Sequence, residues 1–140
     1  MMNVHIIYAT MTKHTKKLAD YLADSLKITA QDVEDKPNLV NTDVLFVGSG
    51  IYGGKISPNL ENYIKSIKVG DVKKAVIFLN SCGGKDESKE LRGLLEEKKI
   101  KVYDKTFICK GKWLLFNRKH PNEEDCMDLV DFSKKALSEI

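Results

Sequence analysis

Short apolar runs alternate with amphipathic segments along this chain, and the alternation restricts the folds it can adopt. Each run has the length of a β-strand, and most of the intervening segments carry apolar residues at the three- and four-residue spacing of helices. Strands separated by helices form a parallel sheet that is covered on both faces. The pattern predicts a single layered α/β domain over residues 1–140, with strands at Val4–Tyr8, Ile28–Val33, Val44–Gly48, Ala75–Leu79 and Val102–Cys109.

The segments between the strands have recognisable helix starts. The first helix is predicted over Lys16–Leu26, and the second begins at Ser57-Pro58, where a favoured cap precedes a favoured first residue. A third helix is predicted to begin at Asp86 or Ser88, and the last at Pro121. The stretch Glu34–Asn41 contains a proline and few apolar residues, so we expect an abbreviated crossover there without a real helix.

Composition is that of an ordinary globular protein. Of the 140 residues, 42% are hydrophobic, which is enough to form a core without metals or disulfides. No segment approaches the roughly 20 apolar residues of a membrane span, and the N-terminus does not resemble a signal peptide. Cys82, Cys109 and Cys126 are widely spaced, and no histidine pair has metal-binding spacing. The cysteine usage favours a reducing cytoplasm, and the spacings predict no metal centre. We further expect a monomer or weak dimer.

Three distinctive turns follow the first, third and fourth strands, namely Thr10–Thr15, Gly48–Gly54 and Asn80–Gly84. Six of the nine glycines lie in the second and third of these turns. In an open parallel sheet, ligands bind beyond the carboxyl ends of the strands, where the strand order reverses. Because glycine lets a backbone approach a ligand closely, the clustering predicts one common ligand site.

The first turn places three hydroxyl side chains, those of Thr10, Thr12 and Thr15, just before or within the start of a helix. A helix N-terminus has unpaired N–H groups and a positive dipole end, so it attracts anions. Threonine is also a favoured helix cap, and any one of the three can have that role alone. Three within six residues exceed what one cap requires, and they favour a phosphorylated ligand.

Positive charge is concentrated between Lys98 and Lys119. This basic region holds eight lysine and arginine residues against one acid, Asp104. We favour a solvated edge strand and loop, where lysine also blocks edge-to-edge aggregation. The alternative is a docking face for an acidic partner. No aromatic residues are interleaved in the manner of a nucleic-acid platform, so we expect no nucleic-acid binding.

The three turns together resemble the phosphate, aromatic and pyrimidine loops of the flavodoxin family. Thr10-Met11-Thr12-Lys13-His14-Thr15 is similar to the family's T/S-x-T-G-x-T phosphate loop, and the resemblance extends over essentially the whole chain in the same element order. It implies a flavodoxin-like three-layer fold, with a doubly wound five-stranded parallel sheet in the order 2-1-3-4-5. It also implies flavin mononucleotide (FMN) as the cofactor.

The resemblance further implies which residues hold FMN. The first loop would bind the phosphate, and Tyr52, or less favourably Ile51, would stack on the flavin ring. Backbone groups of the third loop would bond the pyrimidine edge. The implied cofactor-binding residues are Thr10, Met11, Thr12, Lys13, His14, Thr15, Gly50, Ile51, Tyr52, Gly53, Gly54, Asn80, Ser81, Cys82, Gly83 and Gly84. No residue is assigned a catalytic role.

Two departures from the family pattern bear on function. Lys13 stands where the family usually has glycine, and the net charge is +3, whereas flavodoxins are typically acidic. The resemblance favours an FMN-binding electron carrier that serves redox partner proteins. One alternative is an FMN-dependent oxidoreductase of the same fold, similar to quinone reductases or to flavin-dependent protoporphyrinogen oxidase. Another is a cofactor-free binding module, which the lysine in the phosphate loop keeps open.

Overall fold

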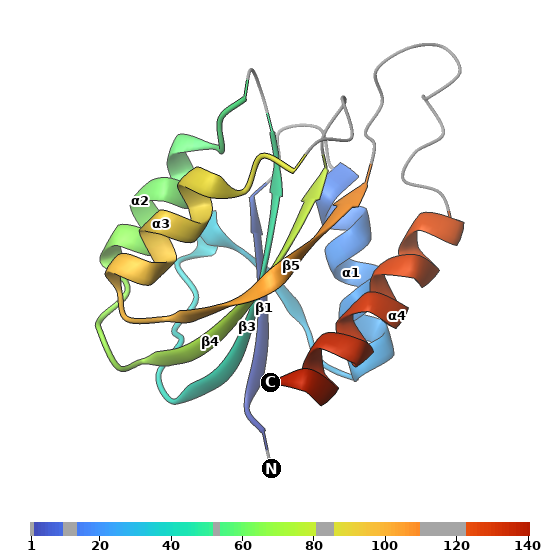
Figure 1. The fold of residues 1–140 in the computed structure, drawn as a ribbon, viewed down its shortest axis with the longest axis horizontal. Helices are drawn as coiled ribbons and strands as arrows, with labels where there is room; N and C mark the ends of the chain where they lie inside the picture. The colour runs from blue at the N-terminus through green and yellow to red at the C-terminus, as the bar shows by residue number, and fades with distance from the viewer. Residues whose placement is uncertain (1, 10–13, 52–53, 81–85, 110–122) are drawn as a thin grey trace.

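A five-stranded parallel sheet forms the centre of the molecule. The computed structural model describes residues 2–9, 14–51, 54–80, 86–109 and 123–140. The sheet has the order β2-β1-β3-β4-β5, and every neighbouring pair is parallel, which confirms the predicted order (Figure 1). The strands are β1 Val4–Ala9, β2 Ala30–Asp32, β3 Thr42–Gly50, β4 Val72–Asn80 and β5 Lys101–Cys109.

Helices cover both faces of the sheet and complete the three layers. α1 and α4 lie together on one face, and α2 and α3 lie together on the other (Figure 1). The helices are α1 His14–Leu26, α2 Pro58–Ser66, α3 Lys89–Glu97 and α4 Glu123–Glu139. Within the part of the chain that the structure describes, no helix is both long and apolar enough to cross a bilayer.

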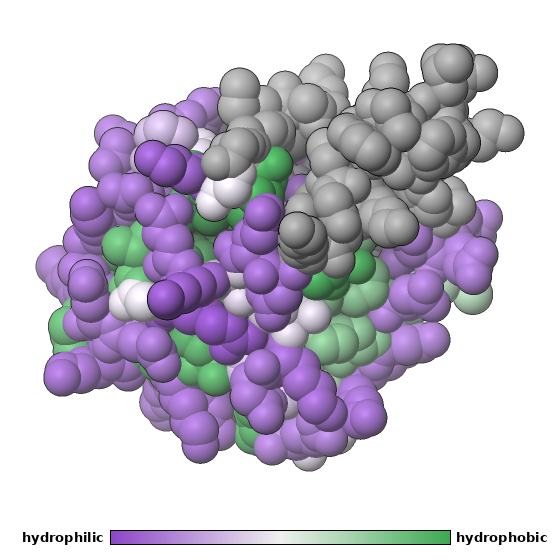
Figure 2. Space-filling view, turned by 45° about the horizontal axis from the view of Figure 1, so that its top comes forward, coloured by the Kyte–Doolittle hydropathy of each residue, from purple (hydrophilic) through white to green (hydrophobic). Residues whose placement is uncertain are grey.

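The sheet separates two hydrophobic clusters. Leu45 and Val47 pack under α2 and α3, while Phe46 and Phe78 pack under α1 and α4. Side chains along a strand point alternately to the two faces, so a central strand with both faces covered must be apolar throughout. This is why the sequence shows continuous apolar runs. Over the described residues, the face in Figure 2 is mainly hydrophilic, with small apolar areas between the polar ones.

The first crossover differs from the prediction at both ends. α1 begins at His14, two residues earlier than expected, and β2 begins at Ala30 instead of Ile28. The late start of β2 follows from how α1 ends. Lys27 has a left-handed φ of 60°, and the Ile28 N–H still bonds the Ala23 carbonyl at 3.0 Å. This is the hydrogen-bond pattern of a Schellman cap, which holds Ile28 against the helix.

The second crossover is abbreviated, as predicted, and contains only the short 3₁₀ helix η1 at Val33–Asp35. The Asp32 carboxylate caps η1 by accepting the Glu34 N–H at 2.9 Å, and this is why Val33 leaves the strand predicted for it. Farther along, Ser57 caps α2 as expected, since its hydroxyl accepts the Asn59 N–H at 3.2 Å.

Candidate functional site

The carboxyl ends of the three strands that precede the marked turns lie next to one another. In the sheet register, Ala9 at the end of β1 lies opposite Ser49 of β3, and Gly50 at the end of β3 lies opposite Asn80 of β4. The Ile51 N–H donates to the Asn80 carbonyl at 3.0 Å, so a backbone bond joins the starts of the second and third turns. The fold therefore brings these three strand ends to one edge.

Thr15, a described residue of the first turn, has a buried hydroxyl group without a hydrogen-bond partner among the described residues. It lies in the first turn of α1 with no exposed surface, and its Oγ1 has no hydrogen bond to the described part of the chain. A buried hydroxyl without a partner costs about 1–3 kcal/mol. Because the first N–H groups of an α-helix have no partner within the helix, the arrangement fits a ligand that accepts hydrogen bonds, such as phosphate.

Asn80 shows the same feature at the end of β4. The residue is 7% exposed, and its Oδ1 atom has no hydrogen-bond partner among the described residues. A carboxamide oxygen is an acceptor, so this atom fits a ligand that presents an N–H group. These two atoms differ in chemistry, since a hydroxyl at the first turn can donate whereas the oxygen at the third can only accept. A third buried atom without a partner among the described residues, Ser133 Oγ, lies in α4.

The second turn is held by packing and backbone bonds. Ser49 Oγ donates to the Gly50 carbonyl at 2.7 Å, and the Ile51 side chain is buried in the cluster beneath α2 and α3. Because the Ile51 side chain packs in the core, Tyr52 remains the candidate for stacking on the flavin ring. Gly54 has a φ of +79°, a conformation that glycine adopts without strain.

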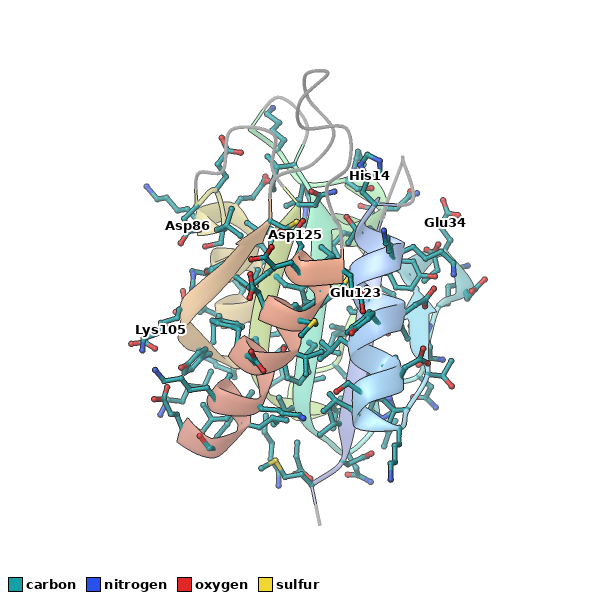
Figure 3. All side chains as sticks on the ribbon, turned by 90° about the vertical axis from the view of Figure 1, so that its right-hand side faces the viewer. His14, Glu34, Asp86, Lys105, Glu123 and Asp125 are labelled. Carbon is teal, nitrogen blue, oxygen red and sulfur yellow. The ribbon has the colours of Figure 1, made fainter. Side chains whose placement is uncertain are left out.

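Several of the predicted site residues lie outside the described residues, and what the sequence implies for them stays a prediction. They are Thr10, Met11, Thr12, Lys13, Tyr52, Gly53, Ser81, Cys82, Gly83 and Gly84. His14 is half-buried at the start of α1. Figure 3 places it toward the same end of the molecule as Asp86 and Asp125.

The two described cysteines, Cys109 of β5 and Cys126 of α4, are core residues. Both are buried in the cluster beneath α1 and α4. Burial raises the pKa of the Cys109 thiol to about 12, and it raises the pKa of the Cys126 thiol as well. Neither thiol therefore has the character of a nucleophile. The described residues contain no group of three or more potential ligands that could hold a metal ion.

The basic region is only partly described. β5 is an edge strand, as the sequence suggested, and its Lys101 and Lys105 side chains are exposed. Lys98 makes a structural contact, because its Nζ donates to the Lys65 carbonyl at 2.7 Å. The residues from 110 to 119 lie outside the described part of the chain, so the role of this region as a docking face stays a prediction.

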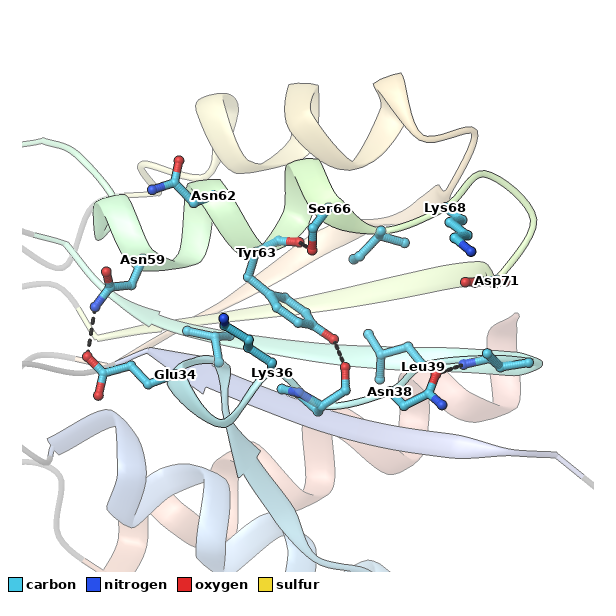
Figure 4. Close-up of a pocket in the computed structure, with 14 residues that line it drawn as sticks. Glu34, Lys36, Asn38, Leu39, Asn59, Asn62, Tyr63, Ser66, Lys68 and Asp71 are labelled. Carbon is cyan, nitrogen blue, oxygen red and sulfur yellow. Dashed lines mark hydrogen bonds between the residues drawn. The ribbon is translucent and has the colours of Figure 1, made fainter.

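A separate groove of about 880 Å³ runs between α2 and the second crossover (Figure 4). Two hydrogen bonds span it. The Tyr63 hydroxyl donates to the Pro37 carbonyl, and Asn59 Nδ2 donates to Glu34 Oε1 at 2.8 Å. Burial raises the pKa of Tyr63 to about 12, so the phenol stays protonated as a donor. These bonds join the helix to the crossover, and among the described residues the groove has no lining residue in common with the three turns.

The hydrogen-bonded cluster around Arg92, which follows the third turn, was not predicted from the sequence. Arg92 is half-buried in α3 and contacts Ser88, Tyr103 and Thr106. The available signal was weak. Arg92 is one of only two arginines in a chain rich in lysine, and it lies four residues after a predicted helix start.

Comparison with known proteins places this arrangement in context. The family model for the flavodoxin domain matches residues 5–115. An uncharacterized protein of Methanocaldococcus jannaschii is 32% identical and aligns with 97% of this chain and 99% of its own.

Two solved structures illustrate how widely the fold is shared. Oxidised flavodoxin 2 from Bacillus cereus has a TM-score of 0.69 at 18% identity, over 99% of each chain. An NADH:FMN oxidoreductase in its apo form has a TM-score of 0.69 at 12% identity, over 98% of this chain and 90% of its own. At such identities, the likeness establishes a common fold.

Proposed function

The chain belongs to the flavodoxin family, and we propose on that basis that it binds FMN and carries electrons between redox partner proteins in the cytoplasm. When bound, FMN would supply the electron-transfer chemistry, and the protein would supply orientation and electrostatics. The observation that carries the proposal is the unpaired Oγ1 of Thr15, a buried donor in the first turn of the helix that follows β1.

Each of the three turns has a task in this proposal. The hydroxyls of Thr10, Thr12 and Thr15, together with backbone N–H groups of the first turn, bind the phosphate through charge-assisted hydrogen bonds. Lys13 adds a cation beside them. Tyr52 stacks on the flavin ring. The third turn, which begins at Asn80, bonds the polar edge of the ring, and the unpaired Oδ1 of Asn80 supports this placement.

The net charge bears on the reduction potential. Reduction adds negative charge to the flavin, and acidic side chains nearby oppose that addition. This chain has a net charge of +3. We therefore expect its bound FMN to have a less negative reduction potential than FMN in an acidic flavodoxin, which a potentiometric titration of the two proteins side by side would measure.

An FMN-dependent oxidoreductase is the second candidate, because the same fold occurs in a NADH:FMN oxidoreductase. The two candidates differ in turnover. A carrier retains FMN but oxidises NADH with a quinone acceptor at a negligible rate, whereas an oxidoreductase turns both over at a useful steady rate. A third candidate, a cofactor-free module, follows if Lys13 prevents the phosphate turn from forming.

The first experiment is a visible absorption spectrum of the purified protein, before and after it is mixed with FMN and desalted. A retained yellow band near one FMN per chain supports the proposal. A colourless protein that does not retain the added FMN contradicts it and favours the cofactor-free module. The variant that tests the phosphate turn is Thr15→Val, which replaces the unpaired hydroxyl with a methyl group and should retain less FMN.

A further inference from the structure

We propose that Arg92 is a positioning residue that fixes the exit of the third turn by joining it to β5. The proposal rests on the proposed function, because the third turn is the segment assigned to the polar edge of the flavin ring. Arg92 itself lies in α3, outside that turn and outside all sixteen predicted cofactor-binding residues. It would act through the residues that it holds and not by touching FMN.

The Arg92 guanidinium makes three hydrogen bonds to three different residues. Its Nε donates to Ser88 Oγ at 2.9 Å, its Nη1 donates to the Tyr103 carbonyl at 2.7 Å, and its Nη2 donates to Thr106 Oγ1. Thr106 Oγ1 in turn donates to Ser88 Oγ at 3.2 Å. Because the guanidinium is planar and rigid, these bonds set the start of α3 in a defined place relative to β5.

The pairing of β5 with β4 is irregular at the place where Arg92 contacts β5. Ala75 of β4 pairs with Val102, but the next pair is Ile77 with Thr106, so residues 103–105 of β5 lie opposite Val76 alone. Such a bulge interrupts the regular ladder of backbone bonds. The Tyr103 carbonyl lies in this bulge, and Arg92 satisfies it from the side of the helix.

The turn side of the contact is Asp86, the first described residue after the third turn. Its Oδ1 accepts the Ser88 N–H at 3.0 Å. Burial acts to raise the pKa of Asp86, but the hydrogen bonds from Ser88 and the charge of Arg92 outweigh it and hold the pKa below its usual value. Asp86 is thus an ionised group that is bonded to Ser88 and attracted by Arg92.

Together these contacts hold the described residues on either side of the third turn. β4 fixes its beginning at Asn80, which pairs with Gly50, and the Asp86–Ser88–Arg92 contacts fix its end against β5. A binding loop is precise when its supporting residues are themselves locked by packing and hydrogen bonds. We therefore expect loss of Arg92 to loosen the described residues at the exit of the third turn, Asp86 and Ser88, while the sheet remains.

The test compares Arg92→Met and Arg92→Lys with Lys98→Met. Lys98 is the matched control, because its cationic side chain also donates to a backbone carbonyl, but on the far end of α3 and toward α2. The first measurement is amide hydrogen exchange of the FMN-free protein. In Arg92→Met, the peptide covering residues 81–88 should exchange about tenfold faster, the order expected when hydrogen bonds to a charged group are lost. The peptide that covers α1 and the exchange of Lys98→Met should not change in this way.

The second measurement is the dissociation constant and the reduction potential of bound FMN. Arg92→Met should weaken FMN binding by about tenfold, as when a supporting contact of a built site is removed, and should shift the potential. Arg92→Lys should have an intermediate effect on the dissociation constant and the potential, since lysine keeps the positive charge but lacks the planar guanidinium that bonds three residues. Lys98→Met should match the wild type in both.

The outcomes separate this proposal from the proposed function. Unchanged exchange of residues 81–88 in Arg92→Met overturns the positioning role, whether or not FMN binds. Faster exchange and a lower melting temperature, with unchanged FMN affinity and potential, also overturn it, because Arg92 then contributes stability alone. A wild-type protein that rejects FMN contradicts the proposed function, and the exchange measurement still decides whether Arg92 holds the turn.

Discussion

Thr42 and Thr15 are both fully buried, yet they differ in what surrounds their hydroxyls. Thr42 begins β3, at the amino-end edge of the sheet, and its Oγ1 donates to the Leu39 carbonyl at 2.7 Å. Thr15 lies at the opposite edge, where the strands end, and its Oγ1 has no partner among the described residues. The threonine hydroxyl thus makes a structural hydrogen bond at one edge and has no described partner at the other.

Other polar side chains at the two edges of the sheet differ in the same way. At the amino-end edge, Asp43 accepts the Asn3 N–H at 2.7 Å and pairs with Lys73 at 3.3 Å. At the carboxyl-end edge, the side-chain oxygen of Asn80 is buried without a described partner. Native proteins satisfy nearly all their buried polar groups, and two of the three buried side-chain atoms without a partner among the described residues, Thr15 Oγ1 and Asn80 Oδ1, lie at the carboxyl-end edge, the third being Ser133 Oγ of α4. This contrast supports the proposal that the carboxyl-end edge receives a ligand.

The largest effect is expected at Gly48, near the carboxyl end of β3, where the backbone packs closely against the buried Phe78 ring. In Gly48→Ala, the new Cβ would lie 2.3 Å from Cε2 of the buried Phe78 ring. Such overpacking should lower the free energy of unfolding by about 3 kcal/mol. Urea unfolding measures the loss. The control is Gly93→Ala, where nothing lies within 4 Å and alanine should stabilise the helix by up to about 1 kcal/mol. Equal stability of the two variants would refute the packing argument.

The next largest effect is expected on FMN affinity when the Thr15 hydroxyl is removed. Thr15→Val should weaken FMN binding by about 1.5–3 kcal/mol, or roughly tenfold to hundredfold in Kd, because a hydrogen bond to a charged phosphate is lost. The FMN-free protein should be as stable as the wild type or slightly more stable, because a buried hydroxyl without a partner is removed. Fluorescence titration with FMN and urea unfolding measure the two quantities. An unchanged Kd would remove Thr15 from the phosphate site.

Thr42→Val is the counterpart at the other edge, and the opposite result is expected. It should lower the free energy of unfolding by about 1 kcal/mol, since the Leu39 carbonyl loses its hydrogen bond in a buried position. FMN affinity should match the wild type. If Thr42→Val weakened FMN binding as much as Thr15→Val, the two edges would not differ in function.

The smallest effect concerns the pH dependence of the amino-end edge. The Asn3 N–H and Lys73 hold the pKa of Asp43 below its usual value. A carboxyl group with a lowered pKa in the folded state stabilises the protein above its ordinary pKa of about 4, and this contribution disappears as the pH falls through the lowered value. Asp43→Asn should therefore flatten the acid limb of a plot of stability against pH. An unchanged limb would show that Asp43 titrates alike in folded and unfolded chains.

Much of the fold could be predicted because its signals are local. The apolar runs of β1, β3 and β4 and the Ser57-Pro58 start of α2 depend on neighbouring residues only. The prediction was less accurate where a cap decided the boundary, as at Lys27, whose left-handed conformation delays β2. The strand order came from the family resemblance and not from any pattern of residues, because pairing joins segments that are distant in sequence.

The candidate site divides in the same way. That Thr15 and Asn80 follow buried strands can be predicted from the sequence, since strand ends and helix starts are local features. The folded structure was needed to find that their polar atoms are buried without a described partner while Thr42 is satisfied, and that Arg92 bonds Tyr103 in the bulge of β5. The physical reason is that a polar group is satisfied by atoms brought near by the fold, and residue type and spacing do not specify them.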